Sequence, residues 1–317
     1  MTVSLSWGGP ARYPDVYERG VAALSSVFGL EVVAAPRVFE PSADPLSRAA
    51  DLMTAFADPS VRGIITTIGG EDSIRLLPYL DPAVIAANPK IFLGYSDTTV
   101  SHFFCFNAGL TTFYGPSVMA GFAELLPYTE AAVRRALLST SPIGVLQPAE
   151  GWTPEWPDWE SFTPRALRPR HGWTFLQGSG IAEGRLLGGC IDVMEFVRGT
   201  SAWPASFDGA ILFLETSEDA PPPLFVTRAL RSYAAMGILH QIRGLIFGRP
   251  GGGERFEEYD AAILQVVRDE EGLAELPIIT GMDFGHTDPM FVLPYGALAR
   301  IDCERRTFAV LESGVID

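Results

Sequence analysis

The strongest local signal in the sequence is Ile91-Phe92-Leu93-Gly94-Tyr95-Ser96-Asp97-Thr98-Thr99. Its apolar first part predicts a buried strand, its middle a short turn, and its end the start of an apolar helix over 98–107. In open α/β folds, ligands bind at the edge where parallel strands end. Ser96 is therefore expected at the carboxyl end of a strand, where a bound ligand can meet its hydroxyl.

The residues around this stretch continue the same alternation of short apolar runs and helix-like segments over 1–140. Such alternation is typical of βα units around a mostly parallel sheet. We expect strands at 3–7, 30–34, 61–68 and 90–94, and helices at 14–28, 47–58, 72–78 and 98–107.

The pattern changes over 141–178, where prolines and tryptophans crowd together. We interpret this segment as a linker or an ordered, loop-rich insertion between an N-terminal domain over 1–140 and a C-terminal α/β domain over 179–317. In the second domain we expect strands at 181–189, 209–215, 242–248 and 276–280, and helices at 223–236 and 259–269.

Length and composition exclude several classes of protein. The chain has 317 residues, of which 47% are hydrophobic and 19% charged, so it buries a large core and is not intrinsically disordered. Its 38 acidic and 23 basic residues give a net charge of −15, which disfavours a nucleic-acid partner. The N-terminus lacks a basic start with an apolar run, and polar residues and glycines interrupt the uncharged stretch 98–123. We therefore expect no membrane partner and a cytoplasmic location.

No metal or cofactor is predicted. Cys105, Cys190 and Cys303 lie far apart, and the four histidines are scattered, so neither a disulfide framework nor a metal site is indicated. Lys90 is the only lysine, and the sequence has no Gly-Lys-Ser/Thr phosphate loop.

Ser96 is the candidate nucleophile. The turn presents its hydroxyl, and the N–H groups of the following helix point toward a developing oxyanion. The pattern follows the logic of a nucleophile elbow, although Thr98 replaces the final glycine of that motif. The alternative is a serine that caps the next helix.

A nucleophilic serine needs a base, and His286 is the best placed of the four histidines. It lies in a glycine-flanked loop after an apolar strand, where a functional side chain can be positioned. His102 is expected to face away from Ser96 or to pack in the core, His240 to lie solvated at a helix end, and His171 to lie in a loop.

An acid that orients the base is expected at Glu215, which ends the apolar strand 209–215. Glu218 and Asp219 compete for that role. Gly69 and Gly70 follow the strand 61–68 and offer backbone N–H groups for half of an oxyanion hole. A phosphate loop is the rival interpretation of these glycines, but no third glycine or lysine follows at the required spacing.

Seven short motifs occur in an order that resembles the LD-carboxypeptidase family of serine peptidases, which includes muropeptide LD-carboxypeptidases and microcin C immunity peptidases. They are GG at 69–70, LLPYLD at 76–81, GYSD at 94–97, GRLLGG at 184–189, ILFLE at 211–215, GLIFGRP at 244–250 and GHTDP at 285–289. The resemblance implies a Rossmann-like or flavodoxin-like N-terminal domain, a β-rich α/β C-terminal domain, an active site between them, and a homodimer.

The resemblance also assigns roles to residues. It makes Ser96 the nucleophile, Glu215 the acid and His286 the base, and it makes the N–H groups of Gly70 and Asp97 the oxyanion hole. The expected substrate is a small peptide or a peptidyl- or aminoacyl-nucleotide of the microcin C kind. A tryptophan-bearing insertion suggests this branch, and it makes Trp152, Trp156 and Trp159 candidate platforms for a nucleobase, with hydrophobic packing as their alternative.

Arg249 is a further candidate for binding an anionic end of the substrate. Two other functions stay open at this point. One is a muropeptide LD-carboxypeptidase that acts in peptidoglycan recycling, and the other is a non-catalytic protein that binds a small molecule in the same cleft.

Overall fold

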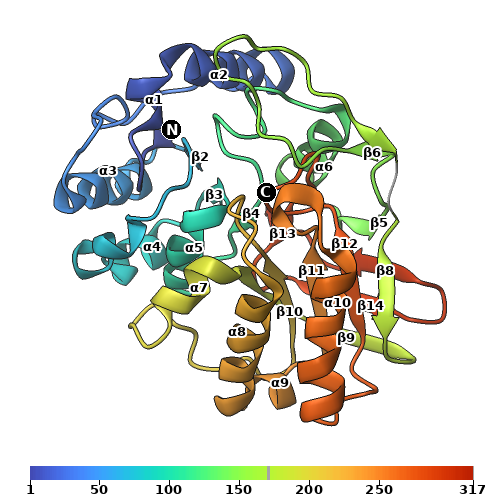
Figure 1. The fold of residues 1–317 in the computed structure, drawn as a ribbon. Coiled ribbons are helices and arrows are strands. Elements are labelled where there is room, and N and C mark those ends of the chain that lie inside the picture. The colour runs from blue at the N-terminus through green and yellow to red at the C-terminus, as the bar shows by residue number, and fades with distance from the viewer. Residues whose placement is uncertain (170–171, 317) are drawn as a thin grey trace.

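A computed structural model describes residues 1–169 and 172–316, and its strands form two main sheets (Figure 1). The first sheet has the strand order β1-β2-β3-β4-β13 and is parallel from β1 to β4. Its strands are β1 (Thr2–Val3), β2 (Gly63–Thr66), β3 (Ile91–Gly94), β4 (Phe113–Tyr114) and β13 (Leu293–Pro294), the last antiparallel to β4. The C-terminal part of the chain therefore completes the sheet that the N-terminal part begins.

Helices accompany this first sheet. They are α1 (Gly9–Arg12), α2 (Pro14–Phe28), α3 (Pro45–Ala57), α4 (Pro82–Ala87), α5 (Thr99–Asn107) and α6 (Pro127–Leu137), with the short helices η1 (Ser73–Tyr79) and η2 (Ser96–Thr98).

The second sheet has eight strands in the order β5-β15-β14-β9-β10-β11-β12-β8. A parallel centre is formed by β9 (Ile181–Cys190), β10 (Ala210–Glu215), β11 (Gly244–Gly248) and β12 (Ile278–Met282). Antiparallel strands flank it, namely β8 (Thr174–Gln177), β14 (Leu298–Asp302), β15 (Thr307–Val310) and β5 (Gly144–Leu146). Every residue of β10, β11 and β12 is buried, as expected for parallel strands covered on both faces.

The helices of this second region are α7 (Ile191–Val197), α8 (Pro223–Ala235), α9 (Ile238–Gln241) and α10 (Phe256–Leu264). The short helix η3 (Gly251–Gly253) precedes α10, and a π-helix, η4 (Gln265–Glu270), follows it. Helices α8 and α10 lie side by side over one face of the sheet (Figure 1). Within the segment between the sheets, β6 (Gly151–Trp152) pairs with β7 (Arg168–Pro169). The fold class expected from the sequence, a parallel-sheet α/β region followed by a β-rich α/β region, is confirmed.

Local signals explain where the sequence prediction held and where it failed. Helix α2 spans the predicted residues because Pro14 fits the first turn and Gly29, at φ 70°, ends the helix in the left-handed conformation. The strand expected at 30–34 is wrong. Only Ala34 makes an isolated bridge, to Thr2, and Leu30 and Val33 are exposed rather than buried in the sheet.

The candidate residues meet where the two sheets adjoin. Ser96 follows β3 of the first sheet, Glu215 ends β10 of the second, and His286 lies in the loop after β12. Among the described residues, no helix is both long enough and apolar enough to cross a membrane.

Candidate active site

Ser96 is the first residue of η2, two residues after the end of β3, and its backbone is strained. Its φ of 62° is in the left-handed region, which a residue with a side chain seldom adopts unless the surrounding structure holds it there. Gly69 lies directly against it, because a Cβ added at residue 69 would come within 2.9 Å of both Cβ and Oγ of Ser96. The turn therefore holds the hydroxyl at the strand end, and a glycine leaves room for it.

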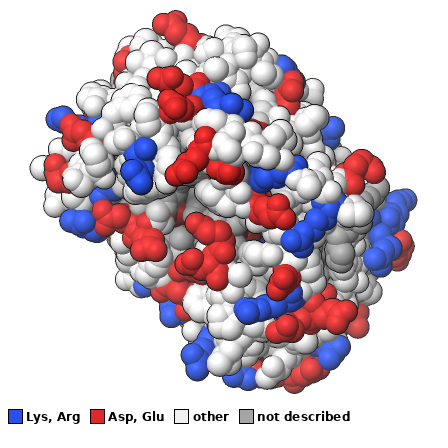
Figure 2. Space-filling view, turned by 45° about the horizontal axis from the view of Figure 1, so that its top comes forward, with Lys and Arg blue, Asp and Glu red and all other residues white. Residues whose placement is uncertain are grey.

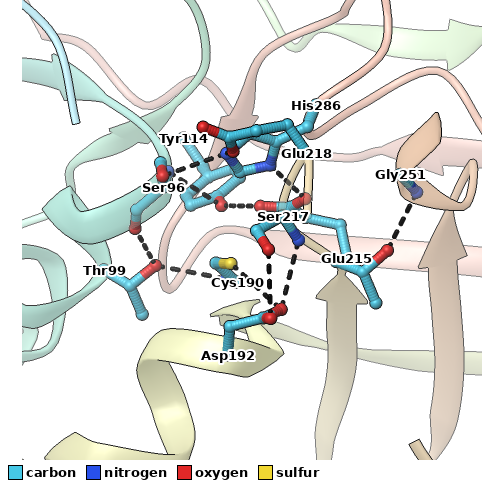
Figure 3. A network of polar contacts seen from close by, with 11 residues as sticks. Ser96, Thr99, Tyr114, Cys190, Asp192, Glu215, Ser217, Glu218, Gly251 and His286 are labelled. Carbon is cyan, nitrogen blue, oxygen red and sulfur yellow. Dashed lines mark hydrogen bonds and ion pairs between the residues drawn. The ribbon is translucent and has the colours of Figure 1, made fainter. Parts of the chain in front are cut away.

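His286 and Glu215 continue from Ser96 as an unbroken series of hydrogen bonds (Figure 3). His286 Nε2 lies 3.0 Å from Ser96 Oγ, and His286 Nδ1 lies 2.7 Å from Glu215 Oε2. Gly285, at φ 94°, leaves space for the acid, since a Cβ there would come within 2.5 Å of Glu215 Oε2. The structure thus brings together the three side chains singled out from the sequence, in the order a general base needs.

Tyr114 is a member of this network that the sequence did not reveal. Its hydroxyl donates a hydrogen bond to Glu215 Oε1 at 2.5 Å and accepts one from the N–H of Ser96 at 3.1 Å. The residue is fully buried in the short strand β4. Tyr114 therefore positions Glu215 and the backbone of Ser96 together. Its only sequence signal is a hydroxyl in an apolar strand, which is common in protein cores.

The charges around His286 favour its protonated form. Burial alone would lower the pKa of the imidazole, but the charge and hydrogen bond of Glu215, with Glu218 and Asp192 farther out, outweigh burial and raise the pKa to about 9. Glu218 Oε2 lies 3.2 Å from Nε2, the nitrogen that also faces Ser96. Glu215 is the acid that meets Nδ1, so the structure places the competitor Glu218 on the opposite side of the ring.

Gly70 lines the same cavity as Ser96 and follows Gly69, which packs against Ser96, and Asp97 is the residue after Ser96. The Asp97 carboxylate accepts hydrogen bonds from the N–H groups of Asp72 at 3.0 Å and Ser73 at 2.9 Å. Ser73 Oγ donates in return to the Asp97 carbonyl at 2.8 Å. These bonds fasten the loop that follows Gly70 to the turn that carries Ser96, so both N–H groups are held in place.

A cavity of about 680 Å³ opens over Ser96 and His286. Trp156 and Trp7 line its rim, and both also line an adjoining pocket of about 460 Å³ together with Trp159. Trp159 stacks on Trp7, with ring centroids 6.1 Å apart and planes 10° from parallel. Trp7 is a second residue that the sequence did not single out, because it precedes a glycine pair near the N-terminus, far from the tryptophan-rich segment.

Trp152 and Arg249 depart from the expectation that they line the substrate site. Trp152 is only 4% exposed and packs against Phe256, with Arg249 5.1 Å from the centre of its ring. Arg249 is fully buried and forms an ion pair with the buried carboxylate of Asp283. A buried carboxylate requires such a cationic partner, so Arg249 is committed to the interior.

The tryptophan-rich segment is fixed onto the loop of the candidate base. Arg165, whose side chain is 6% exposed, pairs with Glu124 at 2.9 Å and with Asp288 at 2.8 Å. The backbones of Thr153 and Asp288 exchange two hydrogen bonds, of 2.7 Å and 2.9 Å. Since Asp288 lies two residues after His286, these contacts hold the segment that carries Trp156 next to the loop of His286, and Trp156 lines the same cavity as His286.

The other histidines have separate environments. His102 is buried, its Nε2 lies 2.9 Å from the Gly94 carbonyl, and burial lowers its pKa to about 3. His240 pairs with Glu271 at the surface. His171 lies outside the described residues. The expectation that His102 packs in the core is met, and its low pKa keeps it neutral there.

One cluster in the described ranges has the donor types of a metal site. Ligand atoms of Cys190, Glu215 and His286 lie within 4.8 Å of one another. Glu215 and His286 are already hydrogen-bonded to each other, and burial raises the pKa of the Cys190 thiol well above its usual value. Because a thiol binds metal as thiolate, this environment suits acid–base chemistry better than a metal ion.

Family models match two parts of the chain: that of the LD-carboxypeptidase N-terminal domain matches residues 1–115, and that of the C-terminal domain matches 183–301. Among curated relatives, a putative carboxypeptidase of Vibrio cholerae is 32% identical over 82% of this chain and 78% of its own. The microcin C7 self-immunity protein MccF of Escherichia coli is 30% identical over 84% of this chain and 78% of its own. A probable murein peptide carboxypeptidase of Bacillus subtilis is 30% identical over 84% of this chain and 77% of its own.

Solved structures agree with these matches. An MccF-like protein of Streptococcus pneumoniae in complex with AMP superposes with a TM-score of 0.88 at 30% identity, covering 98% of this chain and 97% of that one. MccF in complex with aspartyl sulfamoyl adenosine gives 0.85 at 28% identity, covering 99% and 96%. The chain belongs to the LD-carboxypeptidase family of serine peptidases and is a hydrolase of the carboxypeptidase type.

Proposed function

We propose that this enzyme uses Ser96, His286 and Glu215 as a catalytic triad to cleave the amide bond of an aminoacyl- or peptidyl-nucleotide of the microcin C kind. The observation that carries the proposal is the hydrogen-bonded series from Ser96 Oγ through His286 to the buried Glu215, in which Ser96 and His286 line a 680 Å³ cavity. Membership of a peptidase family favours this enzyme over the non-catalytic binding protein.

The chemistry follows from the geometry. Neutral His286 Nε2 takes the proton of Ser96 as Oγ attacks the scissile carbonyl, and the N–H groups of Gly70 and Asp97 stabilise the oxyanion. Protonated His286, held by Glu215, then gives that proton to the leaving nitrogen, and the C–N bond breaks. A water molecule, deprotonated by His286, attacks the acyl-enzyme and releases the carboxylic acid and Ser96.

The nucleotide-like part of the substrate is assigned to the tryptophans at the rim. Structural relatives bind AMP and aspartyl sulfamoyl adenosine, which both contain adenine. Trp7 and Trp156 are about 40% exposed and line both pockets, so each presents ring surface to a flat base; one face of Trp7 is stacked on Trp159. Of the three tryptophans proposed from the sequence, Trp156 and Trp159 support this role and Trp152 does not.

Cleavage of a muropeptide is the second candidate, supported by the similarity to the murein peptide carboxypeptidase. Such a substrate contains an amide bond before a free carboxylate and has no nucleobase. Arg75, which is exposed and lines the cavity, is the most accessible cation for that carboxylate.

Turnover by wild type and by Ser96→Ala tests the proposal on aspartyl sulfamoyl adenosine and on a muropeptide tetrapeptide. We expect wild type to hydrolyse the nucleotide analogue and Ser96→Ala to lose on the order of 10⁴-fold or more in kcat. The control is Ser26→Ala, which removes a serine on the exposed part of α2 and leaves turnover unchanged. Hydrolysis of the tetrapeptide alone supports the muropeptide candidate, and an active Ser96→Ala enzyme rejects the triad.

Three expectations from the sequence stay predictions. These are a homodimer, a cytoplasmic location, and a division into domains at 1–140, 141–178 and 179–317. Sedimentation analysis of the purified chain tests the first of them directly.

A further inference from the structure

Glu218 lies at the active site without belonging to the proposed triad. It follows Glu215 by three residues, in the loop after β10, and its Oε2 is 3.2 Å from His286 Nε2. That nitrogen is also 3.0 Å from Ser96 Oγ (Figure 3). The Glu218 side chain is 55% exposed and lines both the 680 Å³ cavity and the adjoining aromatic pocket. A carboxylate therefore borders the place where the scissile bond has to lie.

The arginines of the cavity are bonded elsewhere. Arg48 and Arg75 are its two arginines in the described ranges, and both pair with Asp72, at 2.5 Å and 3.1 Å. The sole lysine, Lys90, donates instead to the carbonyls of Asp58 and Val61. Acidic side chains gather about the hollow in the middle of the face seen in Figure 2. The Glu218 carboxylate thus faces the cavity without an arginine or lysine partner among the described residues.

We propose that Glu218 binds the ammonium group that a substrate carries on the carbon next to the scissile carbonyl. This inference rests on the proposed function. When the substrate's carbonyl carbon lies against Ser96 Oγ, its α-nitrogen is two bonds away from that carbon. Glu218 Oε2 is close enough to reach this α-nitrogen, because it lies 3.2 Å from His286 Nε2, which itself lies 3.0 Å from Ser96 Oγ. The specificity that follows is for an acyl group with a free α-amine, as in an aminoacyl-nucleotide, over the same group with its amine blocked.

Glu218 is also the acid near His286 that can change partners. Glu215 is fully buried and bonded to Tyr114, Asp192 accepts from the N–H and Oγ of Ser217, and Asp288 is paired with Arg165. The ring of Tyr95 covers the imidazole, at 5.0 Å between centroids. A bound ammonium therefore draws the exposed Glu218 away from Nε2 and leaves that nitrogen to the Ser96 proton. Substrate binding and activation of the base are coupled through one side chain.

The test compares an aminoacyl sulfamoyl adenosine with its Nα-acetyl derivative on wild type and Glu218→Gln. We expect wild type to prefer the free amine by about tenfold or more in kcat/KM, because a charge-assisted contact is lost on acetylation. In Glu218→Gln, kcat/KM for the free amine falls by a similar factor and that for the acetylated compound does not fall, so the ratio approaches one. Glu218→Lys is expected to reverse the preference.

Glu71→Gln is the matched control, since it removes a carboxylate from the same cavity at a residue that does not contact His286. It leaves the ratio of the two substrates as in wild type. An equal loss on both substrates in Glu218→Gln, or no loss on either, overturns the role of Glu218 while the triad stands. Failure of wild type to hydrolyse either compound, with Ser96 unlabelled by a fluorophosphonate, overturns the proposed function and this inference with it.

Discussion

The proposed triad and the aromatic rim of the cavity are built in opposite ways. Glu215 is 0% exposed, its two oxygens are bonded to His286 and Tyr114, Gly69 packs against Ser96, and Gly285 packs against Glu215. Trp7 and Trp156, by contrast, are 41% and 40% exposed. Close packing holds the side chains of the proposed triad in a single conformation, whereas the tryptophans of the rim expose apolar surface that a bound substrate can cover. We therefore expect changes in the triad to lower kcat and changes in the rim to raise KM.

The largest expected effect is that of Glu215→Gln. An amide next to His286 Nδ1 favours the wrong tautomer of the imidazole, which then presents a proton to Ser96 instead of a lone pair. We expect kcat to fall by about 10⁴-fold with little change in KM. Steady-state kinetics on the substrate that wild type prefers measures both constants.

This prediction requires that Glu215→Gln folds like the wild type. Circular dichroism and urea unfolding show whether Glu215→Gln keeps the native fold, which we expect because the two side chains have the same shape. A folded variant that retains more than about a tenth of the wild-type kcat contradicts the role of Glu215 as the acid.

This contrast also explains how much of the molecule the sequence reveals. Glu215 ends an apolar strand, and Ser96 and His286 each come shortly after one, and a strand end is a recognisable place for a functional side chain. Tyr114 and Trp7 have no such signal. Their roles depend on which strands the fold sets side by side, and that requires β4 and the loop after β1 to be placed against residues far along the chain.

Arg249 is the reverse case, a residue that the sequence suggests for substrate binding and that the structure buries. A lone arginine in a Gly-Arg-Pro sequence is as suited to binding an anion as to pairing in the core, and the choice depends on Asp283, 34 residues later. Trp152 is similar, because its neighbours Arg249 and Phe256 come from a distant segment. Burial of such residues follows from long-range packing, which local sequence patterns do not encode.

The next effect in size concerns pH and the charges around the triad. The pKa of His286 is raised to about 9, and the free enzyme needs the neutral imidazole to take the Ser96 proton. Below that pKa the neutral fraction grows about tenfold per pH unit, so kcat/KM is expected to rise about 100-fold between pH 7 and 9 and then level off. A pH profile from 6 to 10 measures this. In Glu218→Gln, which removes one of the charges that raise the pKa, the rise occurs at lower pH.

A profile that levels off near pH 6.5 in wild type contradicts the strong pairing of His286, since 6.5 is the ordinary value for histidine. Activity at pH 7 would then come from an imidazole that the acids hardly affect. Asp192 offers a control, because it lies farther from the ring and is bonded to Ser217. Asp192→Asn is expected to shift the profile less than Glu218→Gln.

The smallest expected effect separates two tryptophans of the same segment. Stacking of a base on an aromatic ring contributes about 1–3 kcal/mol, so Trp156→Ala is expected to raise KM for a nucleotide-containing substrate about tenfold and to leave kcat unchanged. Trp152→Ala removes a side chain that is 4% exposed, and we expect it to lower the free energy of unfolding by about 3 kcal/mol without raising KM. Trp152→Phe repeats that measurement if the alanine variant does not fold. Equal KM values in wild type and Trp156→Ala would show that Trp156 does not bind the base. The substrate would then be recognised by the part of the cavity next to Ser96 and His286.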